Sequence, residues 1–156
     1  MVLQIDSREK ARAITKIVAE FDKQGIKHIT SKLPFGDYMN LDNPKVIIDR
    51  KQSLQEICGN VCQQHARFKR ELELCRDCGC HMIILCEHGG QIKTLDDVER
   101  WVNPRLKESP LAVSGERLYR IMKTMSSTYG VEFLFCDKRS TGKRIIEILG
   151  GKNEIS

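Results

Sequence analysis

One strand-turn-strand segment restricts the fold of this 156-residue chain more than any other. Two apolar, strand-like stretches at residues 36–41 and 45–49 flank Asp42-Asn43-Pro44, a sequence typical of a turn. In a hairpin that turns symmetrically about the central residue of this turn, Asp37 and Asp49 stand directly opposite each other. The segment therefore predicts both the register of a sheet and the meeting of two carboxylates.

Strand-like and helical patterns alternate along the rest of the chain. Strands are predicted for residues 2–5, 26–33, 81–87 and 131–136. Helices are predicted for residues 10–23, from 53, for 64–77, from 94, for 116–129 and for 140–149. Residues 103–115 contain prolines and are expected to connect two of these elements. The alternation around the hairpin predicts an α/β fold with a mixed central sheet flanked by helices.

The composition indicates one globular domain. Hydrophobic residues make up 40% and charged residues 30% of the chain, which is unlike a disordered or fibrous protein. The longest purely apolar run, residues 82–86, is far too short to span a membrane. Charged residues near the start exclude the apolar core of a secretory signal. We therefore expect a single domain over residues 1–156, without a membrane, in the cytoplasm or, in a eukaryote, the nucleus.

The seven cysteines are expected to be free thiols, because their number is odd and no secretory signal is predicted. Zinc ligands could come from Cys75, Cys78, Cys80 and His81, or from Cys58, Cys62 and His65 nearby. The first group is divided between a predicted helix end and a predicted strand start, and no second clean CxxC pair accompanies it. A structural zinc site is therefore not expected.

The facing aspartates indicate phosphodiester chemistry. Two opposed carboxylates repel unless a cation lies between them, and oxygen ligands of this kind suit Mg²⁺. Lys51 follows Asp49 by two residues and shares its face of the strand, whereas Arg50 points to the other face. Such a metal positions a water molecule and neutralises phosphate charge, while the lysine stabilises the developing negative charge or orients the nucleophile. The arrangement predicts metal-dependent hydrolysis of a phosphodiester.

Three short motifs resemble the XPF-type nuclease family. Ile5-Asp6-Ser7-Arg8-Glu9, Phe35-Gly36-Asp37-Tyr38 and Ile47-Ile48-Asp49-Arg50-Lys51 follow the order of that family's DxRE, GD and ERK segments. The spacing is also similar to that of the wider PD-(D/E)XK superfamily, which accepts either acid at the first position of the triplet. The resemblance extends to Arg67-Phe68 and covers roughly residues 1–90.

This resemblance implies a restriction-endonuclease-like fold and a metal-dependent DNA endonuclease that cuts branched or structured DNA. Its expected cofactor is Mg²⁺, with Mn²⁺ as a substitute. The active-site residues it implies are Asp6, Glu9, Asp37, Asp49, Arg50 and Lys51. The metal ligands among them would be Asp6, Asp37 and Asp49.

DNA is the expected partner. Lys and Arg outnumber Asp and Glu by 26 to 21, and the resulting net charge of +5 permits nucleic acid. Phosphate contacts are expected from Arg8, Arg67, Lys69, Arg70, Lys138, Arg139, Lys143 and Arg144. Residues 140–143 superficially resemble the end of an ATP-binding phosphate loop, but Asp137 replaces its first glycine and Arg144 its magnesium-binding hydroxyl. No nucleotide cofactor is expected.

Two other functions remain open. XPF-type proteins usually add helix-hairpin-helix modules after the nuclease, whereas this sequence ends at Ser156. A standalone version, similar to small relatives in bacteria and phages, is therefore expected to act as a homodimer or with a DNA-binding partner. The alternatives are a non-catalytic DNA-binding scaffold subunit and a sequence-specific restriction-type endonuclease. Inactive scaffold subunits characteristically lose the acids and the lysine that are present here, and no residues suited to reading base edges are recognised.

Overall fold

The computed structural model describes residues 1–151, and its strands form a six-stranded mixed sheet in the order β2-β1-β3-β4-β5-β6. The strands are β1 (Val2–Ile5), β2 (Lys27–Thr30), β3 (Tyr38–Asn40), β4 (Asn43–Lys51), β5 (His81–Glu87) and β6 (Glu132–Cys136). β1 is parallel to β2, β3 is antiparallel to both β1 and β4, and β4, β5 and β6 are mutually parallel. The predicted mixed sheet is confirmed.

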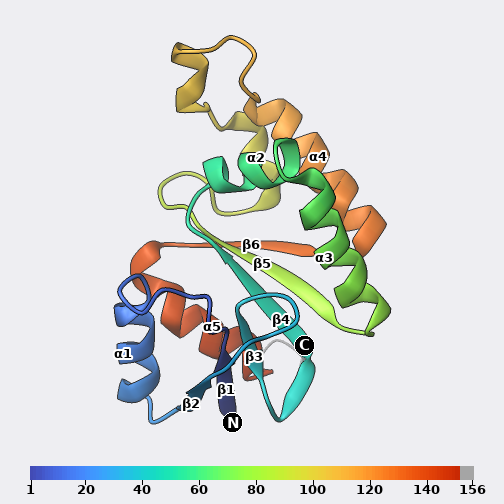
Figure 1. Cartoon of the computed structure of the whole chain (residues 1–156). Coiled ribbons are helices and arrows are strands. Elements are labelled where there is room, and N and C mark those ends of the chain that lie inside the picture. Colours follow the sequence, from blue (N-terminus) through green and yellow to red (C-terminus); the bar gives the residue numbers. More distant parts are fainter. Residues whose placement is uncertain (152–156) are drawn as a thin grey trace.

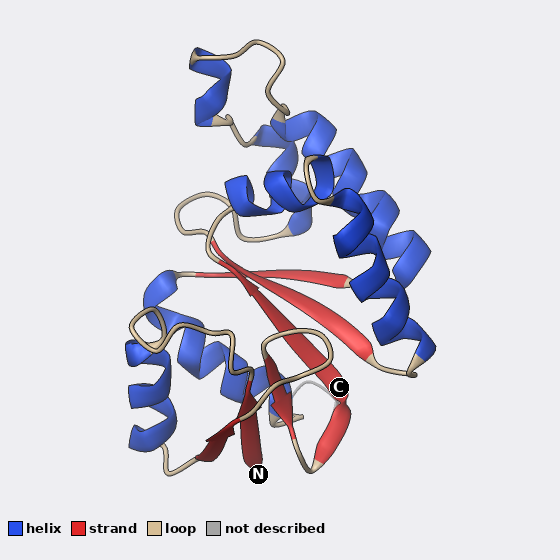
Figure 2. Ribbon diagram, in the orientation of Figure 1, coloured by secondary structure: helices blue, strands red, loops and turns tan. Residues whose placement is uncertain are grey.

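Helices cover both faces of this sheet (Figures 1 and 2). They are α1 (Thr15–Lys23), α2 (Leu54–Cys62), α3 (His65–Asp77), α4 (Gly115–Tyr129) and α5 (Thr141–Leu149), with short 3-10 turns η1 (Leu95–Arg100), η2 (Pro104–Lys107) and η3 (Lys138–Ser140). α1 and α5 pack on one face, and α2, α3 and α4 on the other. Within residues 1–151, no helix is long and apolar enough to cross a membrane.

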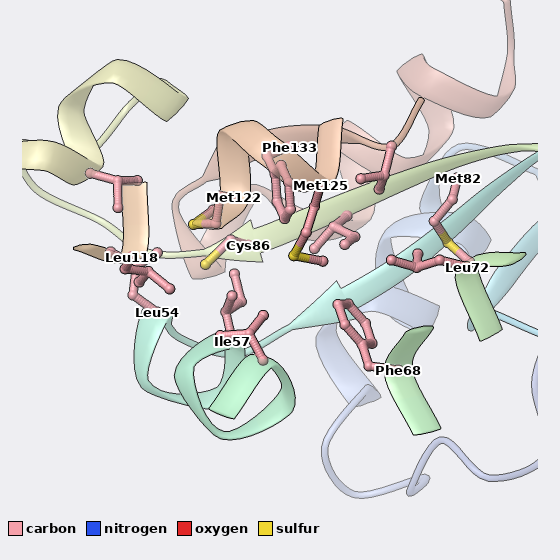
Figure 3. Close-up of a cluster of buried hydrophobic side chains, with 14 of the residues drawn as sticks. Leu54, Ile57, Phe68, Leu72, Met82, Cys86, Leu118, Met122, Met125 and Phe133 are labelled. Atoms are coloured by element: carbon pink, nitrogen blue, oxygen red, sulfur yellow. The ribbon is translucent and has the colours of Figure 1, made fainter. Parts of the chain in front are cut away.

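Alternate residues of the central strands supply two separate cores. On β4, Ile47 belongs to the cluster under α2, α3 and α4, and Ile48 belongs to the cluster under α1 and α5. Ile84 and Ile83 divide in the same way on β5. Successive side chains of a strand point to opposite faces, so a continuous apolar run fits a sheet that is covered on both sides. Figure 3 shows the larger of these clusters.

The hairpin formed by β3 and β4 has the register that the turn predicts near the acids. Tyr38 pairs with Ile48, and one further step in this register places Asp37 opposite Asp49. The amide of Asp37 donates to the carbonyl of Ile48 at 2.8 Å. Closer to the turn the register shifts, because Asn40 pairs with Asn43. The turn is therefore irregular rather than symmetric, although the pairing of the two aspartates is as expected.

The predicted helix at residues 10–23 and the predicted strand at residues 26–33 are each at least four residues longer than the observed elements. The helix predicted from residue 10 begins at Thr15, and residues before it form turns in which Ala13 donates to the carbonyl of Lys10 at 2.9 Å. The strand predicted to residue 33 ends at Thr30, because the amide of Leu33 binds a side chain and not a strand. Local turns thus replace the start of the helix, and a contact with Asp6, just after β1, is made where the strand was predicted to continue.

Replacement of Leu72 by Ala is expected to lower the free energy of unfolding by about 2–5 kcal/mol, because this side chain is 2% exposed in the larger core. Leu74→Ala on the same helix is the matched control: Leu74 is 46% exposed, and the expected change is below about 0.5 kcal/mol. Urea unfolding followed by circular dichroism measures both. Equal losses for the two variants would contradict the packing of α3 described here.

Candidate active site

The acidic residues predicted from the sequence line one cleft of about 340 Å³. The cleft lies at the sheet edge where β1 ends, β3 begins and β4 ends. These three ends meet there because β3 runs antiparallel to both of its neighbours. Its charged lining from these segments comprises Asp6, Arg8, Glu9, Lys10, Asp37, Asp49, Arg50 and Lys51. Residues 30 or more positions apart in the sequence are thus brought to one site.

Asp37 and Asp49 are the central pair of the cleft. Burial, together with the negative charges of Asp49 and Glu9, raises the pKa of Asp37 to about 9. The backbone amide of Arg50 opposes this shift by donating to Asp37 Oδ2 at 2.8 Å. When both are ionised, these two carboxylates carry more negative charge than the groups around them compensate. A cation placed between them would favour the charged form of both.

Lys51 lies on the same side of β4 as Asp49, as its spacing predicts. Its Nζ is 3.1 Å from Asp49 Oδ2 and 5.3 Å from the centre of the Phe68 ring on α3. Burial alone would lower the pKa of Lys51, but the charge of Asp49 and its hydrogen bond outweigh burial and raise it. The side chain is only 11% exposed. It therefore presents a fixed ammonium group beside the acidic pair.

Arg50 points to the opposite face of β4, where two carboxylates enclose its guanidinium. Nη2 donates to Glu9 Oε2 at 2.8 Å, and Nη1 donates to Glu87 Oε1. The side chains of all three residues are at most 6% exposed. The remaining oxygen of Glu87 accepts a hydrogen bond from Thr141 Oγ1 at 2.7 Å. Burial alone would lower the pKa of Arg50, but these acids raise it.

The charge of the site fits a divalent cation. Four carboxylates, on Glu9, Asp37, Asp49 and Glu87, stand against the two cations Arg50 and Lys51, which leaves an excess of two negative charges when all are ionised. The facing carboxylates of Asp37 and Asp49 are hard oxygen donors, and Mg²⁺ commonly takes one or two of these with water and phosphate oxygens. Both the donor type and the charge suit such an ion.

Asp6 does not join this pair. Its Oδ1 accepts from the amide of Leu33 at 2.8 Å, and its Oδ2 accepts from Arg8 Nε at 2.7 Å. Among residues 1–151, no three His, Cys, Asp or Glu side chains are grouped as a metal site. Of the three expected acidic ligands, Asp37 and Asp49 face each other and Asp6 lines the same cleft apart from them, and the assignment of the metal ligands stays a prediction. Asp6, which is 1% exposed, instead fixes the segment that leads from β2 to Asp37.

Gly36 allows the chain to reach Asp37. Its φ of +72° is a conformation that other residues rarely adopt, and a Cβ at this position would overlap the side chain of Ile47. The amide of Gly36 donates to Glu71 Oε1 of α3 at 2.9 Å. The GD motif thus has a local physical basis, because the glycine packs onto β4 immediately before the aspartate.

A model of the ERCC4 domain matches residues 5–149 of the chain. The chain belongs to the ERCC4 domain family. This agrees with the XPF-type motifs of the sequence and indicates a nuclease domain that acts on DNA. Among proteins with curated descriptions, none matches the chain significantly.

The fold of this ERCC4 domain is also that of solved XPF structures. XPF from Aeropyrum pernix is similar with a TM-score of 0.69 and 19% identity, over 99% of this chain and 65% of that one. XPF from Aeropyrum pernix in complex with DNA is similar with a TM-score of 0.69 and 18% identity, over 99% of this chain and 66% of that one. The chain therefore spans less than two thirds of the length of these XPF chains.

The basic residues expected at DNA are divided between two places in the ERCC4 domain. Arg8 and Arg67 line the cleft, whereas Lys69 and Arg70 of α3 are exposed outside its lining. Arg8 is held by Asp6 and by the carbonyl of Leu33. The other place is the start of α5, where the exposed residues are Lys138, Arg139 and Lys143. Arg144 is partly buried and pairs with Glu147 at 3.2 Å.

Sequence reasoning missed three polar residues that support the site, namely Glu71, Glu87 and Thr141. A signal was present for Glu71, because it lies four positions after Arg67 on the same helix and therefore on the same face. Glu87 ends an otherwise apolar buried strand, and the period of two places it on the face of Arg50. Thr141 gave no signal, since its contact with Glu87 joins residues 54 positions apart.

Asp37→Asn is expected to raise the melting temperature of the metal-free protein at pH 8 by roughly 2–4 °C, or ~1 kcal/mol, because asparagine is neutral and removes the cost of binding a proton to Asp37, or of holding its charge opposite Asp49, in the folded protein. The pH dependence should change as well. Folding raises the pKa of Asp37 from 3.8 to about 9. The contribution of Asp37 to the free energy of unfolding is therefore complete below pH 3.8 and is lost as the pH rises to about 9. Asparagine does not titrate, so the Asp37→Asn protein should not lose stability in this way as the pH rises.

Differential scanning fluorimetry between pH 4 and 9, with a chelator present, measures this effect. Asp77→Asn is the matched control, because Asp77 is 70% exposed and pairs only with the neighbouring Arg76. An Asp37→Asn protein that melts at or below the wild-type temperature at pH 8 would show that the repulsion between the two aspartates is not significant.

Proposed function

We propose that this chain is a single nuclease domain that hydrolyses DNA phosphodiesters with Mg²⁺ or Mn²⁺, acting as an endonuclease on branched DNA. The observation that carries this proposal is the facing pair Asp37 and Asp49 with the Lys51 ammonium 3.1 Å from Asp49. Membership in the ERCC4 domain family supports the reaction class. The preference for flaps, forks or junctions rests on the resemblance to XPF-type enzymes.

The residues of the cleft divide the work of hydrolysis. Asp37 and Asp49 would hold the metal ion, which supplies an activated water and neutralises phosphate charge. Lys51 holds a positive charge next to them, where it can stabilise the negative charge that develops on the phosphate or orient the attacking water. The Arg50 amide orients Asp37 through its hydrogen bond to Oδ2. Arg8 and Arg67, which line the same cleft, would bind phosphates of the DNA backbone.

A nuclease explains these residues better than a scaffold subunit does. A scaffold needs only basic surface, whereas this chain holds opposed, poorly compensated acids at a stability cost. A sequence-specific restriction-type enzyme would need side chains that read base edges, and the cleft lining offers mainly charged groups suited to phosphate and metal. XPF from Aeropyrum pernix has been solved in complex with DNA, which supports DNA as the substrate.

The test is cleavage of flap, fork, four-way-junction and plain duplex DNA with Mg²⁺, Mn²⁺ or a chelator. We expect cleavage of the branched substrates that requires a metal. Lys51→Ala should lower the single-turnover rate by about 100-fold or more, because it removes a fixed charge from the transition state. Asp37→Asn should lower it at least as much by weakening the metal site.

The matched controls are Asp77→Asn and Lys23→Ala, both exposed residues away from the cleft lining. They should cleave at the wild-type rate. Cleavage that persists in both cleft variants would overturn the site. Metal-dependent binding of branched DNA without cleavage would favour the scaffold function, and cleavage at one fixed sequence in plain duplex would favour the restriction-type function.

The proposal includes a homodimer, because one domain of this size covers little of a DNA junction. The wild-type protein at micromolar concentration should sediment at about twice the 17.9 kDa of the chain. A monomeric mass at this concentration, both alone and with a branched duplex, would contradict the homodimer and favour a separate DNA-binding partner.

A further inference from the structure

We propose that Glu87 and Thr141, two residues outside the cleft lining, are positioning residues that hold Arg50, and through it Asp37, in the geometry that binds the metal. This inference rests on the proposed function and extends it to a second layer of residues. It assigns a role to the sequence at residues 140–143, which resembles a phosphate loop but lacks that loop's essential residues.

Two acids hold the Arg50 guanidinium from two sides. Glu9 accepts from Nε at 3.3 Å and from Nη2 at 2.8 Å, and Glu87 accepts from Nη1. Glu9 belongs to the segment before α1, and Glu87 ends β5. The planar guanidinium therefore joins two parts of the fold, and its orientation is determined only while both acids stay in place.

The backbone of Arg50 connects this residue to the acidic pair of Asp37 and Asp49. The backbone amide of Arg50 donates to Asp37 Oδ2 at 2.8 Å. The two neighbours of Arg50 along β4 are Asp49 and Lys51, which point into the cleft. A shift of the backbone at Arg50 would therefore displace all three cleft groups together, so the position of the guanidinium on one face of β4 affects the metal site on the other.

Thr141, at the start of α5, holds the carboxylate of Glu87 in place. Thr141 Oγ1 lies 2.7 Å from Glu87 Oε2, 3.2 Å from the carbonyl of Lys138 and 3.6 Å from Cys136 Sγ. A hydroxyl has one proton, and the carboxylate is its nearest and strongest acceptor. Thr141 is 0% exposed and Glu87 is 8% exposed, so water does not readily replace this hydrogen bond.

The start of α5, which carries Thr141, is itself held by a close helix contact. α5 packs directly against α1 at Gly142, where an added Cβ would lie 2.9 Å from Glu20 Cβ and 3.1 Å from the carbonyl of Ile17. The glycine thus permits a close helix contact, and this contact fixes the start of α5. Thr141 and Gly142 serve packing and positioning, which explains why phosphate-loop residues are present without the remainder of the loop.

The experiment compares Thr141→Val, which removes the hydroxyl at similar size, with Thr141→Ser, which keeps it. Mn²⁺ binding is measured by electron paramagnetic resonance, and single-turnover cleavage is measured as a function of Mg²⁺ concentration. Thr141→Val should weaken Mn²⁺ binding and raise the half-saturating Mg²⁺ concentration by up to about tenfold, the lower end of the effect of residues bonded directly to a metal ligand, because Thr141 acts through Glu87 and Arg50. Thr141→Ser should restore both values, and DNA affinity in chelator should not change.

A double variant tests whether Thr141 acts through Glu87. Glu87→Gln alone should weaken Mn²⁺ binding, and adding Thr141→Val to it should cause little further loss. Thr124→Val is the matched control, because it makes the same substitution at an exposed position of α4, where the hydroxyl donates to the carbonyl of Arg120 and not to an acid. It should behave as the wild type in every measurement.

The outcomes separate this inference from the proposed function. Wild-type protein that binds no Mn²⁺ and cleaves no DNA would overturn the proposed function. Wild-type protein that binds Mn²⁺, together with a folded Thr141→Val variant of equal Mn²⁺ affinity, would overturn the positioning role alone. Loss of DNA affinity in chelator with unchanged Mn²⁺ binding would also overturn it, because the start of α5 would then act in DNA contact. A Thr141→Ser protein as impaired as Thr141→Val would show that packing, not the hydroxyl, is what matters.

Discussion

The repulsion between Asp37 and Asp49, which the hairpin register holds opposite each other, is the constraint on which the arrangement of the cleft depends. Like charges facing each other across a β-ladder destabilise it, and partial burial increases the cost. The Arg50 amide and the Lys51 ammonium reduce this cost without removing it. The excess of negative charge that remains when both aspartates are ionised suits a divalent cation, so the repulsion that destabilises the fold also fits the metal-dependent chemistry proposed for the site.

The alternation of side chains between the two faces of β4 decides which charged side chain reaches the cleft. Ile47 and Ile48 enter different cores, and each is at most 2% exposed. Because side chains alternate along a strand, these two residues fix the directions of Asp49, Arg50 and Lys51 that follow them. A slip of one residue would bury the wrong groups on both faces at once. The covered sheet therefore specifies the active-site geometry more strictly than the charged residues could do alone.

The sequence predicts those parts of the molecule that depend on local pattern. The hairpin of β3 and β4, the strand His81–Glu87 and the facing of Asp37 with Asp49 all follow from periodicity and register. The turn predicted at residues 42–44 lies instead at residues 41–42, because Asn43 pairs with Asn40 and begins β4. The other errors lie where long-range contacts replace local preference. The helix predicted from residue 10 begins at Thr15, after a segment in which Glu9 is held by Arg50, 41 positions away. Asp6 is predicted as a metal ligand from its residue type, which gives no sign of the hydrogen bonds that its oxygens accept from Arg8 and Leu33.

The buried group of Glu9, Arg50 and Glu87 is better explained by geometry than by stability. Desolvation of such charges commonly costs as much as their attraction returns, and apolar residues of similar size often stabilise a fold equally well. Arg50 nevertheless orients three acids at once, two through its guanidinium and Asp37 through its amide. A lysine lacks the planar fork and could not bind two carboxylates in fixed directions. Removing either acid would leave part of the guanidinium without an acceptor and its direction no longer fixed, so this edge of β4 keeps its position only while both acids are present.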